Sequence, residues 1–233
     1  MPRIAFLRGW LVGDVATIKA DLLAAIDADG GTGRYDDAGI DAIHALIERL
    51  LPHTPIPRPI DEQAKVAGPW KSLFAQFGPK HTAGKPITHE TSFKLLTFNN
   101  LPDAPLRLLE IEQEIHDVSK DYNNVHIIET IDGSLRGHLI VFGHYTIAAD
   151  TPQRYGVEFS RVGLLSPDGV SDAELRQAFG FEAEQALDIS FKPPKLHSDV
   201  VYCDDDLRIN FGSMGGVYVM SRLHHGGNSV AFE

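Results

Sequence analysis

The hydrophobic pattern near the end of the chain predicts three short strands joined by two turns. Residues 200–202 are β-branched or aromatic, which favours a strand. The three aspartates at 204–206 mark a turn open to water, because unpaired carboxylates are costly to bury. Apolar and polar residues alternate over 207–211, as in a half-buried strand. Glycines then precede an apolar run at 217–220, so the whole segment predicts an antiparallel meander.

The beginning of the chain shows helical spacing instead. Apolar residues recur three and four positions apart over 15–26 and again over 40–51. Asp14 stands where an N-cap of the first helix is expected, and Asp36 or Asp37 where one is expected for the second. The segment between them is short and rich in glycine. We therefore expect two antiparallel helices, a helical hairpin.

Prolines between residues 52 and 59 predict an extended link after the hairpin, because proline stops a helix. We divide the chain into residues 1–62, the hairpin and linker that pack on the rest, and residues 63–233, a β domain, together one globular unit. The apolar segment from Ile4 to Val12 is too short to span a bilayer. It is expected to be an edge strand or a segment packed on the body, or else a weak membrane or partner contact.

After the link, the pattern changes from helical spacing to alternation. Apolar residues alternate with glutamates over 109–115, which is typical of a strand with one wet face. Gly143, within a long β-rich run, indicates a bulge or a corner. The predicted strands ahead of the meander cover residues 68–75, 109–115, 125–128, 135–147 and 154–160. Closing these strands, roughly seven to nine in all, into a barrel would remove exposed sheet edges.

The C-terminal meander resembles the signature of the plastid lipid-associated protein (PAP)/fibrillin family. Tyr202, the acidic turn, the Leu-Arg-Ile segment 207–209, Gly212 and the apolar strand from Val217 stand in the order of that signature. The chain departs from the family at Phe211, where a basic residue is usual.

A second part of the resemblance lies around the proline link. A helix with Leu22 is followed by the link and then by Gly68, Trp70 and Leu73, which resemble the family's first strand. Gln113 and Asn124 match a family glutamine and asparagine on either side of a turn. With the meander, the resemblance spans about residues 15–222.

The resemblance implies lipid association. We therefore expect a mainly β (α+β) protein, a lipocalin-like antiparallel β-barrel preceded by an N-terminal helical hairpin. No transit-peptide pattern is seen, which indicates a bacterial member of the family. We expect it in the cytoplasm, either free or peripheral to membranes or lipid bodies.

Charge and cysteine content narrow the class of partner. The formal net charge of −11 repels phosphate backbones, so we expect no nucleic-acid partner. The single cysteine, Cys203, excludes an intramolecular disulfide and fits a reducing compartment. The sequence has no HExxH motif and no Cys/His pair at zinc spacing. We therefore expect neither a metal nor a cofactor.

Three polar residues are candidates for the barrel interior. Arg208 alternates with Leu207 and Ile209, so it lies on the opposite strand face from them. If the apolar face points inward, Arg208 is outside and pairs with an aspartate of the preceding turn. If the other face points inward, Arg208 is a buried cation that could hold a carboxylate or a phosphate.

The other two candidates carry similar alternatives. Arg161 continues the face of Tyr155 and Phe159, which places it inward near the barrel mouth unless the strand ends earlier and leaves it solvated. Gln113 stands on the presumed inner face, where its amide bonds either the backbone or a ligand. Aromatic strand residues complete the predicted ligand-binding set, either as core or as the wall of an apolar pocket. They are Trp70, Phe74, Phe142, Tyr155, Phe159 and Tyr218.

These features favour a non-catalytic protein that binds a small apolar or amphipathic molecule, such as a lipid or isoprenoid, in a barrel pocket. Two alternatives stay open. One is a structural or interaction protein whose barrel is filled by its own side chains. The other is an enzyme on a lipocalin-like scaffold, with a polar pocket around Arg161, Gln113 or Arg208. The sequence leaves the oligomeric state open.

Overall fold

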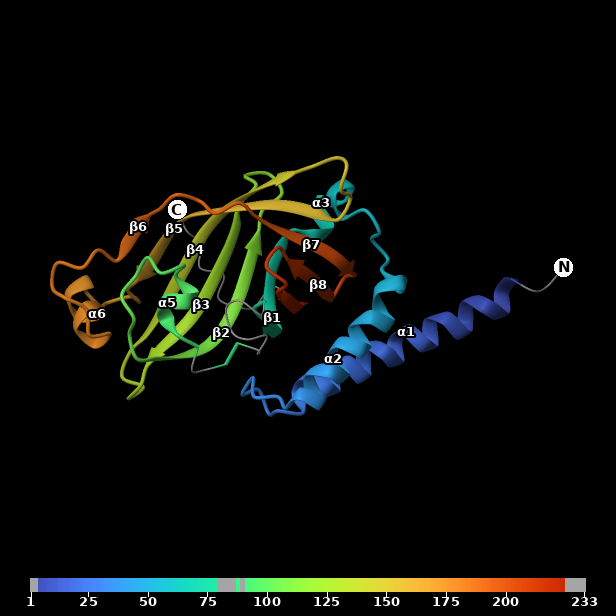
Figure 1. The fold of residues 1–233 in the computed structure, drawn as a ribbon, viewed down its shortest axis with the longest axis horizontal. Helices are drawn as coiled ribbons and strands as arrows, with labels where there is room; N and C mark the ends of the chain where they lie inside the picture. Colours follow the sequence, from blue (N-terminus) through green and yellow to red (C-terminus); the bar gives the residue numbers. More distant parts are fainter. Residues whose placement is uncertain (1–3, 79–86, 89–90, 225–233) are drawn as a thin grey trace.

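The computed structural model describes residues 4–78, 87–88 and 91–224, with side chains from residue 15 onward. Its helical hairpin consists of α1 (Ile4–Asp27) and α2 (Asp37–Leu50). Asp36 caps α2 as predicted, because its side chain accepts a hydrogen bond of 2.7 Å from the backbone N–H of Gly39. The hairpin lies against one side of a β-barrel (Figure 1).

The described residues contain nine strands, all paired antiparallel. They are β1 (Gly68–Gln76), β2 (Leu106–Ile115), β3 (Tyr122–Thr130), β4 (Arg136–Ile147), β5 (Arg154–Leu165), β6 (Asp188–Ser190), β7 (Leu196–Cys203), β8 (Leu207–Gly212) and β9 (Val217–Arg222). β6 pairs at the edge of β5. The other strands close in the order β4-β3-β2-β1-β9-β8-β7-β5, and β5 pairs back onto β4. The predicted barrel preceded by a helical hairpin is therefore confirmed.

Short helices complete the fold. A 3-10 helix, η1 (Leu51–His53), directly follows α2, and η2 (Pro59–Asp61) and α3 (Gln63–Val66) lie in the link before β1. Another short helix, α5 (Phe93–Leu96), lies before β2. Ser171 caps α6 (Asp172–Ala178) through a capping box with Glu174.

The start of the chain differs from its prediction. The segment expected to be an edge strand or a packed segment, Ile4 to Val12, is the first part of α1, so Asp14 lies inside the helix instead of capping it. Nothing in this segment stops a helix, since an interior glycine costs only about 1 kcal/mol relative to alanine. The apolar spacing that begins at residue 15 therefore does not mark the beginning of the helix.

Bulges interrupt the strand pairing and reverse the faces of the residues that follow. Register shifts lie between Ser72 and Phe74 in β1, and between Phe142 and Gly143 in β4, where one extra residue of β5 is accommodated. Gly143 was expected to mark such a bulge, and a Cβ there would lie 2.7 Å from the ring of Phe159. Past each bulge, simple alternation no longer predicts which side chains face inward.

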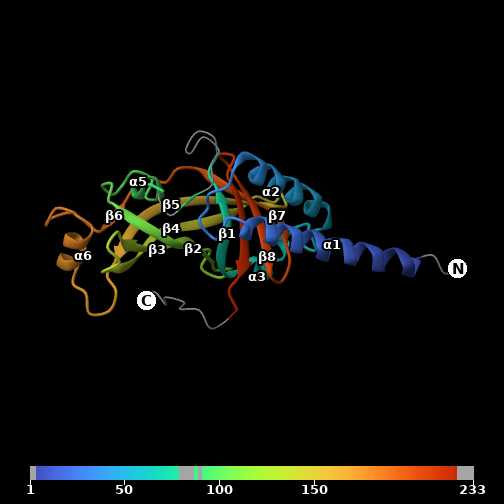
Figure 2. The ribbon, with the colours of Figure 1, turned by 90° about the horizontal axis from the view of Figure 1, so that it is seen from below.

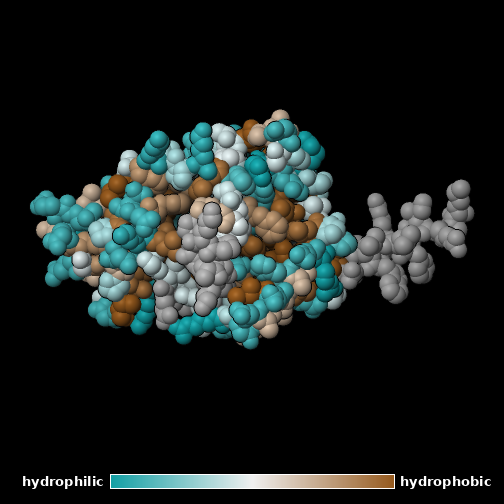
Figure 3. All heavy atoms as spheres, in the orientation of Figure 1, coloured by the Kyte–Doolittle hydropathy of each residue, from teal (hydrophilic) through white to brown (hydrophobic). Residues whose placement is uncertain are grey.

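The hairpin packs its apolar stripe on the outer face of the barrel. Ile18 and Leu22 of α1 and Ile43 and Ile47 of α2 are buried against residues of β1, β7, β8 and β9. Figures 1 and 2 both place the hairpin beside these strands. On the face drawn in Figure 3, most residues are hydrophilic and smaller apolar areas lie between them. The hairpin therefore covers apolar strand positions that would otherwise meet water.

The hairpin contributes directly to stability, and Ile47→Ala tests its contribution. Ile47 is 2% exposed, so removing its side chain loses buried apolar surface and leaves a cavity. We expect the free energy of unfolding to fall by about 2–5 kcal/mol in chemical denaturation. Glu48→Ala, at the exposed neighbouring position, should change it by less than about 0.5 kcal/mol. A hairpin that only rests on the barrel would give equally small losses for both variants.

Candidate functional site

Strand β8 is buried on both of its faces. Leu207 and Ile209 are 2% and 0% exposed and pack outward against the hairpin. Arg208 and Asn210 are 0% and 1% exposed and face the barrel interior, where Arg208 contacts side chains of β1, β2 and β9. The apolar face of this strand therefore lies outside the barrel and the polar face inside. Of the two alternatives for Arg208, the buried interior cation is correct.

The aspartate that could have paired with Arg208 has another partner. Asp204 accepts a contact of 2.5 Å from Lys19 Nζ on α1 and one of 2.7 Å from the hydroxyl of Tyr202. These bonds, with two from backbone N–H groups, hold the pKa of Asp204 below its usual value, although burial acts in the opposite direction. The acidic turn is thus tied to the hairpin at Asp204.

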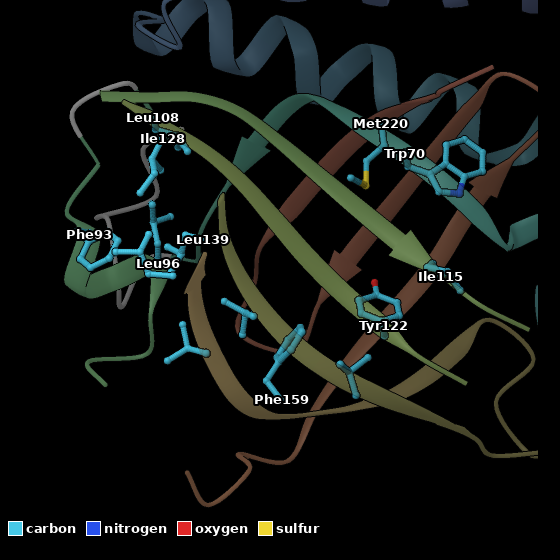
Figure 4. Close-up of a cluster of buried hydrophobic side chains, with 14 of the residues drawn as sticks. Trp70, Phe93, Leu96, Leu108, Ile115, Tyr122, Ile128, Leu139, Phe159 and Met220 are labelled. Atoms are coloured by element: carbon cyan, nitrogen blue, oxygen red, sulfur yellow. The ribbon is translucent and has the colours of Figure 1, made fainter. Parts of the chain in front are cut away.

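The interior contains a cavity of about 350 Å³. In Figure 4 the buried side chains form two groups, one with Trp70, Ile115, Tyr122 and Met220, the other with Phe93, Leu96, Leu108, Ile128 and Leu139. The cavity reaches residues of both groups, since Leu96, Tyr122 and Met220 all line it. Phe159, drawn apart from both groups in Figure 4, lines it as well.

The wall and the floor of the cavity differ in polarity. Apolar and aromatic side chains from several strands and from the segment around α5 form the wall, including Phe77, Leu95, Phe98, Val157, Phe159, Leu196 and Tyr218. Polar side chains of β2, β3, β7 and β8 form what we call the polar floor, defined as Gln113, Tyr122, Asn124, Ser198 and Asn210. A guest would meet apolar surface along its length and hydrogen-bonding groups at one end.

Arg208 lies directly behind the polar floor. Its Nη2 donates a short hydrogen bond to Gln113 Oε1 and lies 3.0 Å from Met220 Sδ. Its guanidinium carbon is 4.6 Å from the ring centroid of Trp70. The Nε and Nη1 atoms are buried and have no hydrogen-bond partner in the described part of the protein. Burial lowers the pKa of Arg208 from its ordinary value, because the charged form has lost its water.

Two hydrogen-bonded chains build the polar floor. Gln113 Nε2 donates to Asn124 Oδ1 at 2.9 Å. Asn210 Nδ2 donates to Ser198 Oγ at 2.8 Å and to the hydroxyl of Tyr122 at 3.4 Å, while its Oδ1 has no partner among the described residues. Both partners of Asn210 are hydroxyl groups, which can donate or accept a hydrogen bond. The amide oxygen and the amide nitrogen of Asn210 could therefore exchange positions and still bond the same two hydroxyl groups. Each chain thus leaves hydrogen-bonding capacity for a guest.

His126 adds an acceptor to the cavity wall. Its Nδ1 lies 3.3 Å from the backbone carbonyl of Leu139, and burial lowers its pKa to about 4. The ring is therefore neutral near pH 7, and because a carbonyl only accepts, Nδ1 carries the proton. The other ring nitrogen, Nε2, then presents a lone pair.

The link before β1 closes the end of the barrel that lies beyond Arg208, on the far side from the cavity. Tyr155 donates from its hydroxyl to the carbonyl of Pro59 at 2.8 Å, and Trp70 Nε1 donates to the carbonyl of Val66 at 2.9 Å. Arg222 covers the Trp70 ring at 4.1 Å and donates to the carbonyl of Ala67 at 2.8 Å. The proline link therefore covers this end of the barrel, and Trp70 connects it to Arg208 behind the polar floor.

Six of the nine predicted ligand-binding residues face the interior, at two depths. Gln113, Phe159 and Tyr218 line the cavity. Arg208 lies just behind the floor, while Trp70 and Tyr155 belong to the closed end. The sequence predicted that the Gln113 amide would bond either the backbone or a ligand. In the structure it bonds two side chains, those of Asn124 and Arg208.

The other three predicted residues, Phe74, Phe142 and Arg161, lie outside the barrel. The inward placement of Arg161 is wrong, whereas Phe74 is a core residue, as one of its two interpretations allowed. The bulge at Leu73 turns Phe74 toward the hairpin, where its ring is 5.5 Å from that of Tyr35. Arg161 follows the extra residue of β5, so it faces outward, stacks on Phe142 at 3.7 Å and pairs with Asp188 at 2.8 Å. One inserted residue per strand is enough to exchange the two faces.

Sequence reasoning missed most of the polar floor and His126. Asn124 and His126 stand two apart on β3, on the same face as the fully buried Ile128, and this spacing was the available signal. Asn210 follows Arg208 by two positions, so the same alternation places both side chains on one face of the strand. Three His, Cys, Asp or Glu side chains that could together hold a metal ion do not occur among the described residues.

The lowered pKa of His126 predicts a pH-dependent contribution to stability. The unfolded chain binds a proton at this ring below pH 6.5, whereas the folded protein does so only near pH 4. His126 therefore costs stability as pH falls through this window, by up to about 3 kcal/mol. In denaturation series from pH 7 to pH 4, His126→Gln should lose less stability than the parent by about this amount, and His144→Gln, at an exposed position, should follow the parent. Parallel curves for His126→Gln and the parent would contradict the assignment of a buried neutral ring.

Comparison with known proteins places the chain in a family. Residues 16–221 match the model of the PAP_fibrillin family. No curated protein matches the chain. Among solved structures, a lipocalin-like protein from Bacteroides uniformis ATCC 8492 aligns with a TM-score of 0.30 at 13% identity over 68% of this chain and 99% of its own. An uncharacterized protein from Bacteroides eggerthii DSM 20697 aligns with a TM-score of 0.29 at 14% identity over 67% and 98%. In the described part, none of the helices is both long and apolar enough to cross a membrane. The family match covers most of the sequence, and the chain belongs to the PAP/fibrillin family.

Proposed function

We propose that this protein binds one small amphipathic molecule, of the lipid or isoprenoid class, in the barrel cavity. One observation carries the proposal: a cavity of about 350 Å³ combines an apolar wall with a hydrogen-bonding floor. This volume lies within the range of about 300–1,000 Å³ that is usual for small-molecule sites. The family membership supports it further, because the resemblance to PAP/fibrillin proteins implies lipid association.

The volume limits the guest. It equals that of roughly a dozen water molecules at about 30 Å³ each, which suits one chain or one ring system and is too small for a whole two-chain lipid. The apolar wall would take up hydrocarbon and exclude water from it. The polar end of the guest would lie at the polar floor, because an apolar end there would leave Asn210 Oδ1 without a partner.

The alternative functions receive less support. A scaffold protein with a filled barrel does not account for a hollow of this size. For an enzyme, the cavity residues with a strongly shifted pKa are His126 and Tyr218, and burial holds both in their neutral forms. The lining that the structure describes contains no carboxylate, lysine or cysteine beside them. Non-catalytic binding is therefore the function we propose, while residence in the cytoplasm, contact with lipid surfaces and a bacterial source stay predictions.

Blocking the cavity tests the proposal. Val157 of β5 and Leu196 of β7 are paired neighbours that both line it, so Val157→Trp combined with Leu196→Trp would place two indole rings in the space of the guest. We expect native mass spectrometry of the protein purified from its own cells to show a co-purifying small molecule. The double variant should lose it, with affinity for a fluorescent lipid probe reduced at least about tenfold, or by about 1.4 kcal/mol.

The matched control replaces the adjacent exposed residues, Glu158→Trp with Lys195→Trp, which add the same rings outside the cavity. Circular dichroism would establish that both double variants keep the parent fold. Loss of binding only in the inward variant supports a guest inside the barrel. Equal binding by parent and both variants would show that the cavity is not the binding site.

A further inference from the structure

We infer that the guest is an acid, and that Arg208, acting through the polar floor, selects its negatively charged headgroup, a carboxylate or a phosphate. This inference rests on the proposed binding function and adds the charge class of the ligand. Three observations carry it: the missing counter-charge around Arg208, the orientation of Gln113, and the single layer of side chains between Arg208 and the cavity.

The first observation is the isolation of the guanidinium. Arg208 is 0% exposed, and no carboxylate forms an ion pair with it in the part of the protein that the structure describes. Its Nε and Nη1 groups also lack hydrogen-bond acceptors there. Burying an unpaired charge is among the most unfavourable arrangements in a protein. Such a group is expected where function requires it, and a bound anion would supply the missing charge.

The described side chains around Arg208 offer no anion at this place. Cys203 and Tyr155 contribute to the electrostatic surroundings of Arg208, but burial raises the pKa of Cys203 to about 11 and that of Tyr155 well above its usual value. Both side chains are therefore neutral near pH 7 and cannot balance the guanidinium. Among the described residues nothing supplies the counter-charge, which is the place that the headgroup of an acidic guest would take.

The second observation is that Arg208 fixes the direction of the Gln113 amide. Because Nη2 of Arg208 donates to Gln113 Oε1, the amide nitrogen of Gln113 points the other way, where one of its two N–H bonds goes to Asn124. Gln113 and Asn124 both line the cavity, and the second N–H of Gln113 and the NH₂ group of Asn124 are the donors that this chain can offer to a guest. A guanidinium that polarises such a chain strengthens its donors. The floor therefore favours a group that accepts hydrogen bonds and carries negative charge.

The third observation is the short distance between the charge and the guest. Gln113 and Met220 both touch Arg208 Nη2 and both line the cavity, so one side-chain layer separates the guanidinium from a bound headgroup. Across such a layer, in surroundings of low dielectric constant and away from salt, attraction between opposite charges stays substantial. Arg161, on the outer face, is already paired with Asp188 and has no such role.

Three ligands with the same hydrocarbon chain separate the possible outcomes. Lauric acid, monolauryl phosphate and lauryl alcohol would be titrated into the full-length protein by calorimetry at pH 8, where both acids are ionised. We expect the parent to bind at least one of the acids about tenfold or more tightly than the alcohol. The stronger of the two acids would identify the headgroup as carboxylate or phosphate.

Variants of Arg208 assign the preference to that residue. Arg208→Met should bring the affinities for acid and alcohol to within about threefold of each other, while the alcohol still binds. Arg208→Lys, which keeps the charge, should restore part of the preference. Arg161→Met removes an arginine that also stacks on an aromatic ring, but outside the barrel, and should keep the full preference.

A second measurement needs no variant and so does not depend on the variants folding. The pKa of a bound acid labelled with carbon-13 at its carboxyl would be read by NMR in the parent protein. Nearby positive charge lowers this pKa below that of the free acid, whereas burial without a nearby cation raises it. We expect a lowered value, and a raised one would overturn the inference.

The outcomes distinguish this inference from the function on which it rests. Equal affinity of the parent for acid and alcohol, or an unchanged preference in Arg208→Met, overturns the inference and leaves the binding function standing. Failure of all three ligands to bind contradicts both. A preference that is lost in Arg208→Met and kept in Arg161→Met supports both.

Discussion

The docking of the hairpin on the outer face of the barrel is the constraint on which the structure depends. It buries apolar residues that would otherwise face water, including Leu207 and Ile209 on β8 and Ile43 and Ile47 on α2. Because the hairpin buries these apolar residues on the outer face of the barrel, strand β8 can turn its polar face inward. The polar interior and the buried Arg208 are consequences of this arrangement. A barrel without such a cover would have to place its apolar faces inside.

The remaining features of the site follow from how the two barrel ends are closed. The proline link blocks one end through bonds from Trp70 and Tyr155 to its carbonyl groups. At the other end, side chains of α5 such as Phe93 and Leu96 fill part of the space beneath them and leave the rest hollow. The cavity is therefore an apolar passage that ends on polar groups backed by a positive charge. That gradient of polarity is what an amphipathic guest requires, and it links the hairpin's packing to the proposed function.

The elements of this fold could largely be predicted from the sequence, whereas the site could be predicted only in part. Apolar spacing, the prolines and the alternating runs identify the hairpin, the link and most strands, because these depend on local preferences. Alternation shows that the two faces of a strand differ, but it does not say which face is inside when both are buried, as Arg208 illustrates. Gly143 indicated one bulge but not which side chains it would turn, and the bulge in β1 left no signal; the two place Arg161 and Phe74 outside the barrel. His126 was missed because its role depends on Leu139, a residue of the neighbouring strand.

Hydrogen exchange at the Arg208 side chain tests the central claim most directly, that the hairpin leaves a solitary guanidinium inside a closed barrel. Nitrogen-15 NMR of the arginine Nε–H groups reports how fast each one exchanges with water. Arg208 Nε is fully enclosed, so its exchange should require opening of the barrel and be slower by orders of magnitude than that of the half-exposed Arg161. Equal exchange rates for the two groups would mean that Arg208 meets water, and would contradict the account.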